Sequence, residues 1–320
     1  MCQTCKTSLS VYPSFPAGSQ SAISLATKSA KLDPREVIAM SMQRTMMNHV
    51  RIVLPKIQTA ISLLTMEAVA RIERGMHLIA LDAKDRWTRI LFDAQIHTMR
   101  AASISGWKAG GNVAGITKSE DIFPEDSWGD FDVDDDFFYS DVDEKVDSHF
   151  EEHSQREANY LLTFVTGLYD EWSNGTKEEN GHKRPLTQQE IITGVREGMQ
   201  KKNPVYSNIA AQMGVVWAFN QGLKQRYAII GYTKVRWWAT FDERGPCPYC
   251  ESLHLQVVDI QENFVEAGGD ITGLKLDAEG AINEVRMRIP EYMAIEHPPA
   301  HCLCRCTLFP WEEDIAVIEY

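Results

Sequence analysis

The residues best suited to chemistry in this chain are cysteines and one histidine, gathered in two short segments. The first segment is CPYC, which holds Cys247 and Cys250, and the second is PPAHCLCRC, which ends at Cys306. Five of the seven cysteines lie in these two segments. Two thiolates spaced in this way can bind one metal ion from a tight turn, and His301 and Cys304 can complete a tetrahedral site. The sequence therefore predicts a metal centre that joins the two segments.

Zinc is the expected ion, because it takes four Cys and His ligands in tetrahedral geometry. The preferred ligand set is Cys247, Cys250, His301 and Cys304, with Cys306 as the competitor for the fourth place. Four or more available ligands leave no open position for a substrate, so we expect a structural rather than a catalytic site. A structural zinc ion contributes on the order of 10 kcal/mol to the folding of a small domain.

Other residues are weaker candidates for ligands. Cys302 is the least expected, because neighbouring residues in an extended stretch point to opposite faces. His254 and His297 lie close enough in the sequence to replace a ligand. Cys2 and Cys5 form a further CxxC, but no second ligand pair lies near them. Two alternatives without a metal stay open, namely buried free thiols and a disulfide between two of the cysteines.

No pattern in the sequence indicates an enzyme. Neither a Ser-His-Asp pattern nor a GxSxG motif is visible, and His301 and Cys302 are sequence neighbours, which rarely present both groups to one substrate. The glycine-rich stretch 106–119 lacks the Lys that directly follows the last Gly of a phosphate-binding loop. We therefore expect no enzymatic activity.

The negative charge of the chain is concentrated in one block. The net charge is −13, and between Glu120 and Glu152 fifteen Asp and Glu residues stand against one Lys. The rest of the chain is therefore close to neutral. Proteins that bind duplex nucleic acid carry a broad basic surface, which this distribution does not favour.

The sequence predicts neither a membrane span nor export. It has no run of about eighteen apolar residues, and its first residues lack the basic start and the apolar stretch of a signal peptide. Seven cysteines are an odd number, without the spacing of a secreted disulfide framework. We expect reduced thiols, inside a cell or in a particle assembled there.

Helical periodicity predicts the scaffold that positions the two segments. We expect a mainly α fold, in which a long helical N-terminal region precedes a small α+β C-terminal domain clamped by the zinc site. The β-branched and aromatic stretch 234–241 is expected to form the strand that leads into CPYC. The expected order is a flexible arm at 1–30, a helical region at 31–117, an acidic linker or docking segment at 118–152, a helical region at 153–230 and the zinc-clamped domain at 231–320.

Capping residues and prolines predict the helix boundaries. Thr187 and Glu190 have the spacing of a capping box, which opens a helix. Pro55 is expected to kink or restart the first helix, and Pro204 is expected to break the helix that the capping box opens. The polar stretch 173–185 is expected to be a loop.

The acidic block has a partial resemblance to a calcium loop. Asp130, Asp132 and Asp134 have the spacing of the first three ligands, but Asp135 stands where the loop needs Gly and Asp141 where it needs Glu. The aromatic residues interleaved with the acidic ones instead favour docking onto a basic, apolar groove of a partner.

The stretches RWWATFDERGPCPYCESL and IEHPPAHCLCRCTLFPW resemble phage minor head proteins of the Mu protein F-like head morphogenesis family. The resemblance covers about residues 205–310. This chain has His254 where the family usually has Gly, and Cys302 where it usually has Pro. The matching residues are Trp237 or Trp238, Asp242, Cys247, Cys250, Pro298, Pro299, His301, Cys304, Arg305 and Cys306, with Asn220 and Gly222 on the preceding helix.

This resemblance implies a minor structural protein of a tailed-phage head. Such proteins bind the portal or the inner capsid surface during procapsid assembly, and some are thought to act on the DNA or to be ejected with it. The implied partners are the portal protein, the major capsid or scaffold protein, and packaged DNA. The implied location is the phage head, after assembly in the host cytoplasm.

The alternative function is a nucleic-acid-binding module built on a zinc knuckle. The net charge opposes it, but six basic residues could give a local basic face. Salt-dependent DNA binding would favour this alternative. The six residues are Lys201, Lys202, Lys224, Arg226, Lys234 and Arg236.

Overall fold

The computed structural model describes residues 34–75, 81–118, 136–179, 182–240, 247–276 and 281–311. The described residues are mostly helical (66%), with a long helical region followed by a small strand-containing region near the C-terminus, which confirms the predicted fold class. It divides into two compact units, one made of residues 46–230 and the other of residues 1–45 with 231–320. The N-terminal arm and the first positions of the calcium-type spacing, Asp130 to Asp135, lie outside the described ranges, so neither prediction is tested.

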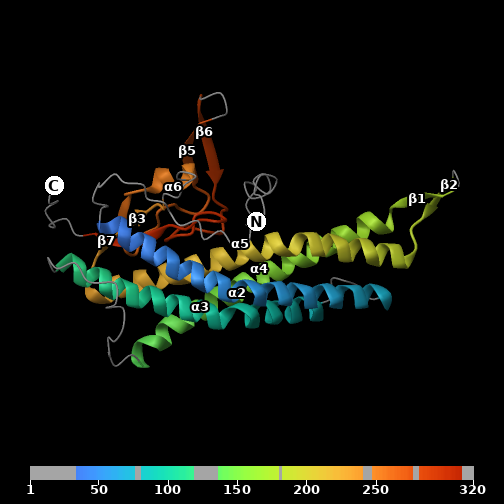
Figure 1. The fold of residues 1–320 in the computed structure, drawn as a ribbon, viewed down its shortest axis with the longest axis horizontal. Coiled ribbons are helices and arrows are strands. Elements are labelled where there is room, and N and C mark those ends of the chain that lie inside the picture. The colour runs from blue at the N-terminus through green and yellow to red at the C-terminus, as the bar shows by residue number, and fades with distance from the viewer. Residues whose placement is uncertain are drawn as a thin grey trace, which may run out of the picture. The chain divides into compact units, whose positions relative to one another are not determined.

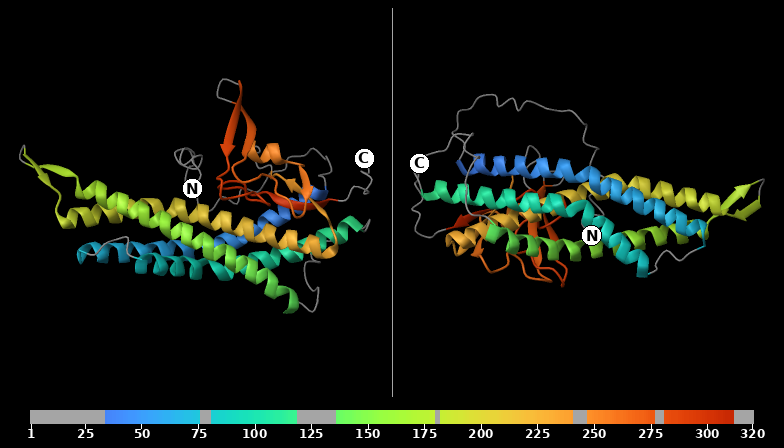
Figure 2. Two further views of the ribbon diagram at one scale, coloured as in Figure 1. Left: turned by 180° about the vertical axis from the view of Figure 1, so that it is seen from behind. Right: turned by 90° about the horizontal axis from the view of Figure 1, so that it is seen from below.

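Four long helices dominate the fold (Figure 1): α2 (Pro34–Glu73), α3 (Leu81–Lys118), α4 (Asp136–Ser173) and α5 (Gln188–Ile230). In the unit of residues 46–230, α3 packs against α4 and α5, and α4 also contacts α5. The helices run side by side in both views of Figure 2. The core of this unit is aliphatic and aromatic, with fully buried side chains such as Ile57, Trp87 and Phe219.

Two prolines lie inside continuous helices, so the predicted break at Pro204 is wrong. An internal Pro costs about 3 kcal/mol or more, because it removes one backbone hydrogen bond and crowds the preceding turn. Tertiary packing on either side of each proline offsets this free-energy cost, so both helices stay continuous. Val53 and Ile57 are fully buried on either side of Pro55, and the Tyr206 ring, two residues after Pro204, stacks on a tyrosine of α4 at 5.5 Å between centroids.

Two segments that were expected to be irregular are regular. The helix α4 begins at Asp136, so the second half of segment 118–152 is helical rather than a linker. The expected loop 173–185 contains an antiparallel hairpin, β1 (Thr176–Glu179) and β2 (His182–Pro185). The Asn-Gly pair between them is the sequence signal that could have revealed it.

The start of α5 confirms the predicted capping box. The Thr187 backbone N–H donates to Glu190 Oε2 at 2.9 Å, and the Glu190 backbone N–H donates to Thr187 Oγ1 at 3.3 Å. Arg184 of β2 also pairs with the Glu190 carboxylate. The hydrogen bond from Arg184 is the main cause that lowers the pKa of Glu190 well below its usual value. This cluster joins the hairpin to the first turn of α5.

The helices α3 and α5 cross at two glycines. A Cβ at Gly106 would lie 1.9 Å from the Phe219 carbonyl oxygen, and a Cβ at Gly222 would lie 2.0 Å from the Ser103 carbonyl oxygen. Only Gly permits such a close approach of two backbones. The fully buried Asn220 donates to the Val216 carbonyl in the same region.

The strand-containing unit is built on a three-stranded antiparallel sheet with the order β4-β3-β7. The central strand β3 is shorter than predicted and packs Trp237, fully buried, against the ring of Phe264. A short helix follows β3, and a separate hairpin follows β4. Their bounds are β3 (Lys234–Trp238), α6 (Pro248–Leu253), β4 (Val257–Asp259), β5 (Asp270–Leu276), β6 (Ile282–Arg288) and β7 (Thr307–Trp311).

The helix α2 meets a simple test for a membrane span. Among the described residues, Arg35–Glu73 contains a window of mean hydropathy 1.3, of which 44% is buried. The core helix of a soluble protein meets the same criteria of length and composition, so this is weak evidence for a membrane span. The absence of a span therefore stays a prediction.

Candidate metal centre

The first segment of the candidate site is fixed by the start of α6. Cys247 is the N-cap residue with an extended backbone, Pro248 follows at the first helical position, and Cys250 lies in the first turn. The Glu251 backbone N–H donates to the Cys247 carbonyl at 2.9 Å, which closes that turn. Residues at the N-cap and three positions later lie close together, which is the geometry of a capping box. The CPYC spacing thus places both sulfur atoms at the same helix end.

The second segment forms a turn that leads directly into β7. The Cys304 backbone N–H donates to the His301 carbonyl at 3.2 Å, and Leu303 adopts a left-handed conformation with φ of 64°. The hydroxyl of Thr240, just after β3, donates to the Arg305 carbonyl at 2.7 Å. The turn is therefore attached to the strand that precedes CPYC.

The two segments meet in two overlapping groups of metal-ligating side chains. The ligand atoms of Cys247, Cys250 and His301 all lie within 4.8 Å of one another, and so do those of Cys250, Cys304 and Cys306. Cys250 belongs to both groups. The four cysteines are free thiols, so no disulfide joins any two of them. We refer to the five residues as the donor cluster. Cys302 is disulfide-bonded, so the expectation of reduced thiols is wrong for that residue.

Distances within the donor cluster fit a tetrahedral ion. The sulfur atoms of Cys250 and Cys304 lie 3.8 Å apart. A tetrahedral zinc ion with Zn–S bonds of about 2.3 Å separates two sulfur ligands by about 3.8 Å. The Cys250 sulfur lies 2.9 Å from His301 Nε2. This is a hydrogen-bond distance, and the two atoms would have to move about 0.6 Å apart to bind one tetrahedral zinc ion, which holds sulfur and nitrogen ligands about 3.5 Å from each other.

The orientation of His301 is also that of a metal ligand. Its Nδ1 lies 2.6 Å from the Cys302 carbonyl oxygen, so this nitrogen is the donor. In the neutral ring that binds a metal, the lone pair is then on Nε2, which faces the thiols. Metal-binding histidines commonly donate their second ring N–H to a carbonyl in this way, which fixes the tautomer and the ring orientation.

Charges are already separated between the two partly exposed donors. A hydrogen bond with Cys250 is the main cause that lowers the pKa of Cys247 to about 4, with a further contribution from His301. Burial alone would lower the pKa of His301, but its hydrogen bond with Cys247 and the charges of Cys304 and Cys247 raise that pKa to about 9. Without a metal, both shifts favour the charged forms, a thiolate at Cys247 and a protonated ring at His301.

The three buried thiols share hydrogen bonds rather than ionising together. Burial raises the pKa of Cys304, but hydrogen bonds with Cys250 and Cys306 outweigh this effect and leave the pKa below its usual value. Hydrogen bonds to other cysteines raise the pKa of Cys250, and burial raises that of Cys306. Three thiolates in one dry site need a cation to offset their repulsion, which a bound metal would supply.

The structure places the remaining candidates outside the donor cluster. His254 Nδ1 accepts a hydrogen bond from the Ala239 backbone N–H at 3.1 Å, and its ring lies edge-on to that of Trp238. His297 is buried, with Nδ1 2.7 Å from the Pro298 carbonyl oxygen. Neither histidine belongs to a metal-ligating group among the described residues, and Cys302 does not either.

One residue that supports the site was not singled out from the sequence. A Cβ at Gly273 in β5 would lie 2.3 Å from the Pro248 carbonyl oxygen. The hairpin of β5 and β6 therefore packs directly against the start of α6. A Gly inside a strand pattern is a signal of close backbone approach, but it does not say which backbone approaches.

The basic residues proposed for nucleic-acid binding are largely occupied by contacts within the fold. Cation–π contacts of this kind desolvate one face of the charge. Lys224 is only 8% exposed. The stacked residues are Lys202 over Tyr160 and Phe164, Arg226 over Trp107, and Arg236 over Trp311.

No protein-family model, curated protein or solved structure matches this chain. Its function has to be argued from the donor cluster, from the fold and from the motifs that the sequence carries.

Proposed function

We propose that the donor cluster binds one structural zinc ion. Cys247, Cys250, His301 and Cys304 supply the four ligands, and Cys306 competes for the fourth place. Thiolate and imidazole donors suit zinc better than the hard cations that prefer oxygen. The observation that carries this assignment is the convergence of both segments on Cys250.

The ion would hold together elements that are distant in the sequence. It joins the first turn of α6 to the turn before β7, on either side of the β5–β6 hairpin. With four protein ligands the site has no open position, so its role is structural rather than catalytic.

We further propose that the protein is an assembly component of a tailed-phage head. The paired CPYC and HCLCRC motifs resemble the minor head family, and both halves of that pattern meet in one site. Asn220 and Gly222, which also match the family, lie where α5 crosses α3. The portal and the major capsid or scaffold protein are the proposed partners, with packaged DNA as a further contact.

The test is the protein content of particles. Purified virions and procapsids should contain the chain at a copy number well below that of the major capsid protein, and co-expression with the portal should yield a complex. If the chain is missing from both kinds of particle and does not bind the portal, the proposed role in the phage head is wrong.

The zinc-knuckle alternative is less well supported, because four of its six basic residues are stacked on aromatic rings or buried. It predicts DNA binding by the full chain that weakens steeply as salt rises. That measurement separates the two functions.

A further inference from the structure

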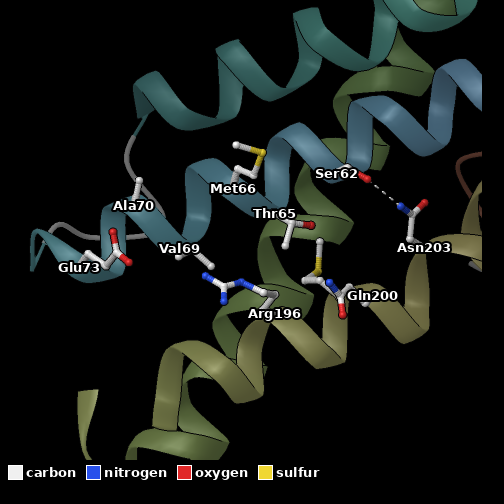
Figure 3. A pocket seen from close by; sticks show the side chains of 10 residues that line it. Ser62, Thr65, Met66, Val69, Ala70, Glu73, Arg196, Gln200 and Asn203 are labelled. Atoms are coloured by element: carbon white, nitrogen blue, oxygen red, sulfur yellow. Dashed lines mark hydrogen bonds between the residues drawn. The ribbon is translucent and has the colours of Figure 1, made fainter. Parts of the chain in front are cut away.

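A groove of about 370 Å³ lies between α2 and α5 (Figure 3). Its buried apolar residues include Val69 from α2 and Met199 from α5. At one end of the groove, Asn203 of α5 donates to the Ser62 hydroxyl and to the Gln58 carbonyl, which fixes the spacing of the two helices there. The groove is therefore bounded on both sides by rigid helix backbone.

An exposed apolar ridge on α2 forms one edge of the groove, and its Met66 is one of the lining residues. Met66 is 68% exposed and Leu63 is 51% exposed. Residues three apart are neighbours on a helix surface, so the two side chains form one continuous ridge. No charged residue occurs from Ile57 to Met66. Val205, 38% exposed, adds apolar surface on α5. This uncharged ridge is the kind of surface that protein interfaces bury at their centre.

Two opposite charges line the same groove. Glu73 and Arg196 are both exposed and both among its lining residues. Within the part of the chain that the structure describes, neither side chain forms an ion pair. An occupant that satisfies both must bring one positive and one negative group.

We propose that a second copy of this chain covers the groove, in a twofold-symmetric dimer. The Leu63–Met66 ridge of each copy enters the groove of the other, and Arg196 of each copy faces Glu73 of the second copy. A twofold contact uses the same patch on both molecules, so the patch must be complementary to itself. Here a ridge and a groove lie next to each other, and the groove carries one charge of each sign.

The first test is the association state of the full chain, purified with zinc and reductant. Sedimentation velocity over about a hundredfold range of concentration should show a monomer–dimer equilibrium, because dimer formation follows mass action. Met66→Glu and Leu63→Glu should each raise the dimer dissociation constant by about tenfold or more, because each places a charge in a buried apolar contact. The matched control is Ile229→Glu, which changes an aliphatic residue near the far end of α5 whose exposure (47%) is close to that of Leu63, and it should leave the constant unchanged.

The second test separates contact between copies from contact within one copy. Arg196→Glu and Glu73→Arg should each weaken self-association, because each brings like charges together. Mixing these two variants should restore association, since the first copy then offers two carboxylates and the second offers two guanidinium groups. An unfolded variant would be recognised by its loss of helical circular dichroism.

A wild-type chain that stays monomeric over the whole concentration range overturns the proposal. The ridge would then be a contact surface for a different protein. A dimer that is insensitive to Met66→Glu, or one that mixing does not restore, places the contact elsewhere and overturns it as well.

Discussion

At the scale of single residues, Cys250 matters most to the metal centre, because its sulfur atom lies in both groups of donors. Cys250→Ser should remove stoichiometric zinc and lower the free energy of unfolding of the strand-containing unit by several kcal/mol. Elemental analysis of the reduced protein and a denaturation curve measure the two effects. Ser252→Ala, a change on the same short helix outside the donor cluster, is the control and should keep its zinc. A Cys250→Ser variant that retains one equivalent of zinc would exclude this site.

Cys304 and Cys306 can be distinguished by replacing zinc with cobalt. With Cys247, Cys250, His301 and Cys304 as ligands, the ion has three thiolates. The intensity of the sulfur-to-cobalt charge-transfer absorption should then fall by about a third in Cys304→Ser. It should be unchanged in Cys306→Ser. The reverse result would assign the fourth place to Cys306.

The chemistry of the candidate ligands explains which of them could be predicted from the sequence. Cys247 and Cys250 were predictable, because CxxC spacing acts over a single helical turn. The meeting of both segments was predictable only because thiolates and imidazole attract the same ion. The sequence could not predict that Cys306 lies beside Cys304 in the donor cluster. That position depends on the left-handed turn at Leu303 and on where β7 begins.

At the scale of elements, the crossing of α3 and α5 gives a prediction with a matched control. In a helix interior, Gly→Ala normally stabilises by about 1 kcal/mol. Gly167→Ala in α4 should show this gain, because no atom lies within 4 Å of the new Cβ. Gly222→Ala should instead destabilise, because its Cβ would lie 2.0 Å from the Ser103 carbonyl oxygen. Urea denaturation measures both, and equal effects of the same sign would contradict the crossing.

The hairpin and the start of α5 give a pH-dependent prediction. The pKa of Glu190 is lowered in the folded chain, so its contribution to stability is complete above its unfolded value of 4.5 and is lost as the pH falls towards the folded one. The thermal midpoint of Glu190→Gln should lie below that of the wild type at pH 7. This difference should shrink as the pH falls below about 4.5.

Glu197→Gln is the matched control on the same helix. A loss as large as that of Glu190→Gln, or a difference for Glu190→Gln that does not depend on pH, would argue against the pairing with Arg184.

Local signals and long-range contacts explain which elements could be predicted. The capping box at Thr187 was readable, because both partners lie within one turn. The continuity of α5 through Pro204 was not, since it depends on Tyr206 packing against another helix. The same holds for Gly273, whose partner Pro248 is remote in the sequence.

At the scale of the whole molecule, all five donors belong to the unit of residues 1–45 and 231–320, whereas α3, α4 and α5 belong to the other unit. The mainly helical character was predictable from periodicity, because an apolar stripe repeats in each helix. The division into these two units was harder to predict from the sequence, because the first turns of α2 belong to the same unit as the strands. Met42, for example, accepts a hydrogen bond from Thr307 of β7 through its sulfur atom.

This division predicts what metal removal does. If the proposed ion is bound, a chelator should release it and loosen β3, α6 and β7, because the ion would hold the turn before β7 against the start of α6. The helices α3, α4 and α5 bury their own core and contain no donor residue, so they should keep their protection. Hydrogen exchange measured by mass spectrometry should show faster exchange in peptides from 234–238, 247–253 and 304–311, with little change in peptides from 85–118 and 188–230. Adding zinc back should restore the slow exchange.

Faster exchange of equal size in both units would mean that the ion stabilises the whole chain, and no change anywhere would mean that the donor cluster holds its shape without a metal.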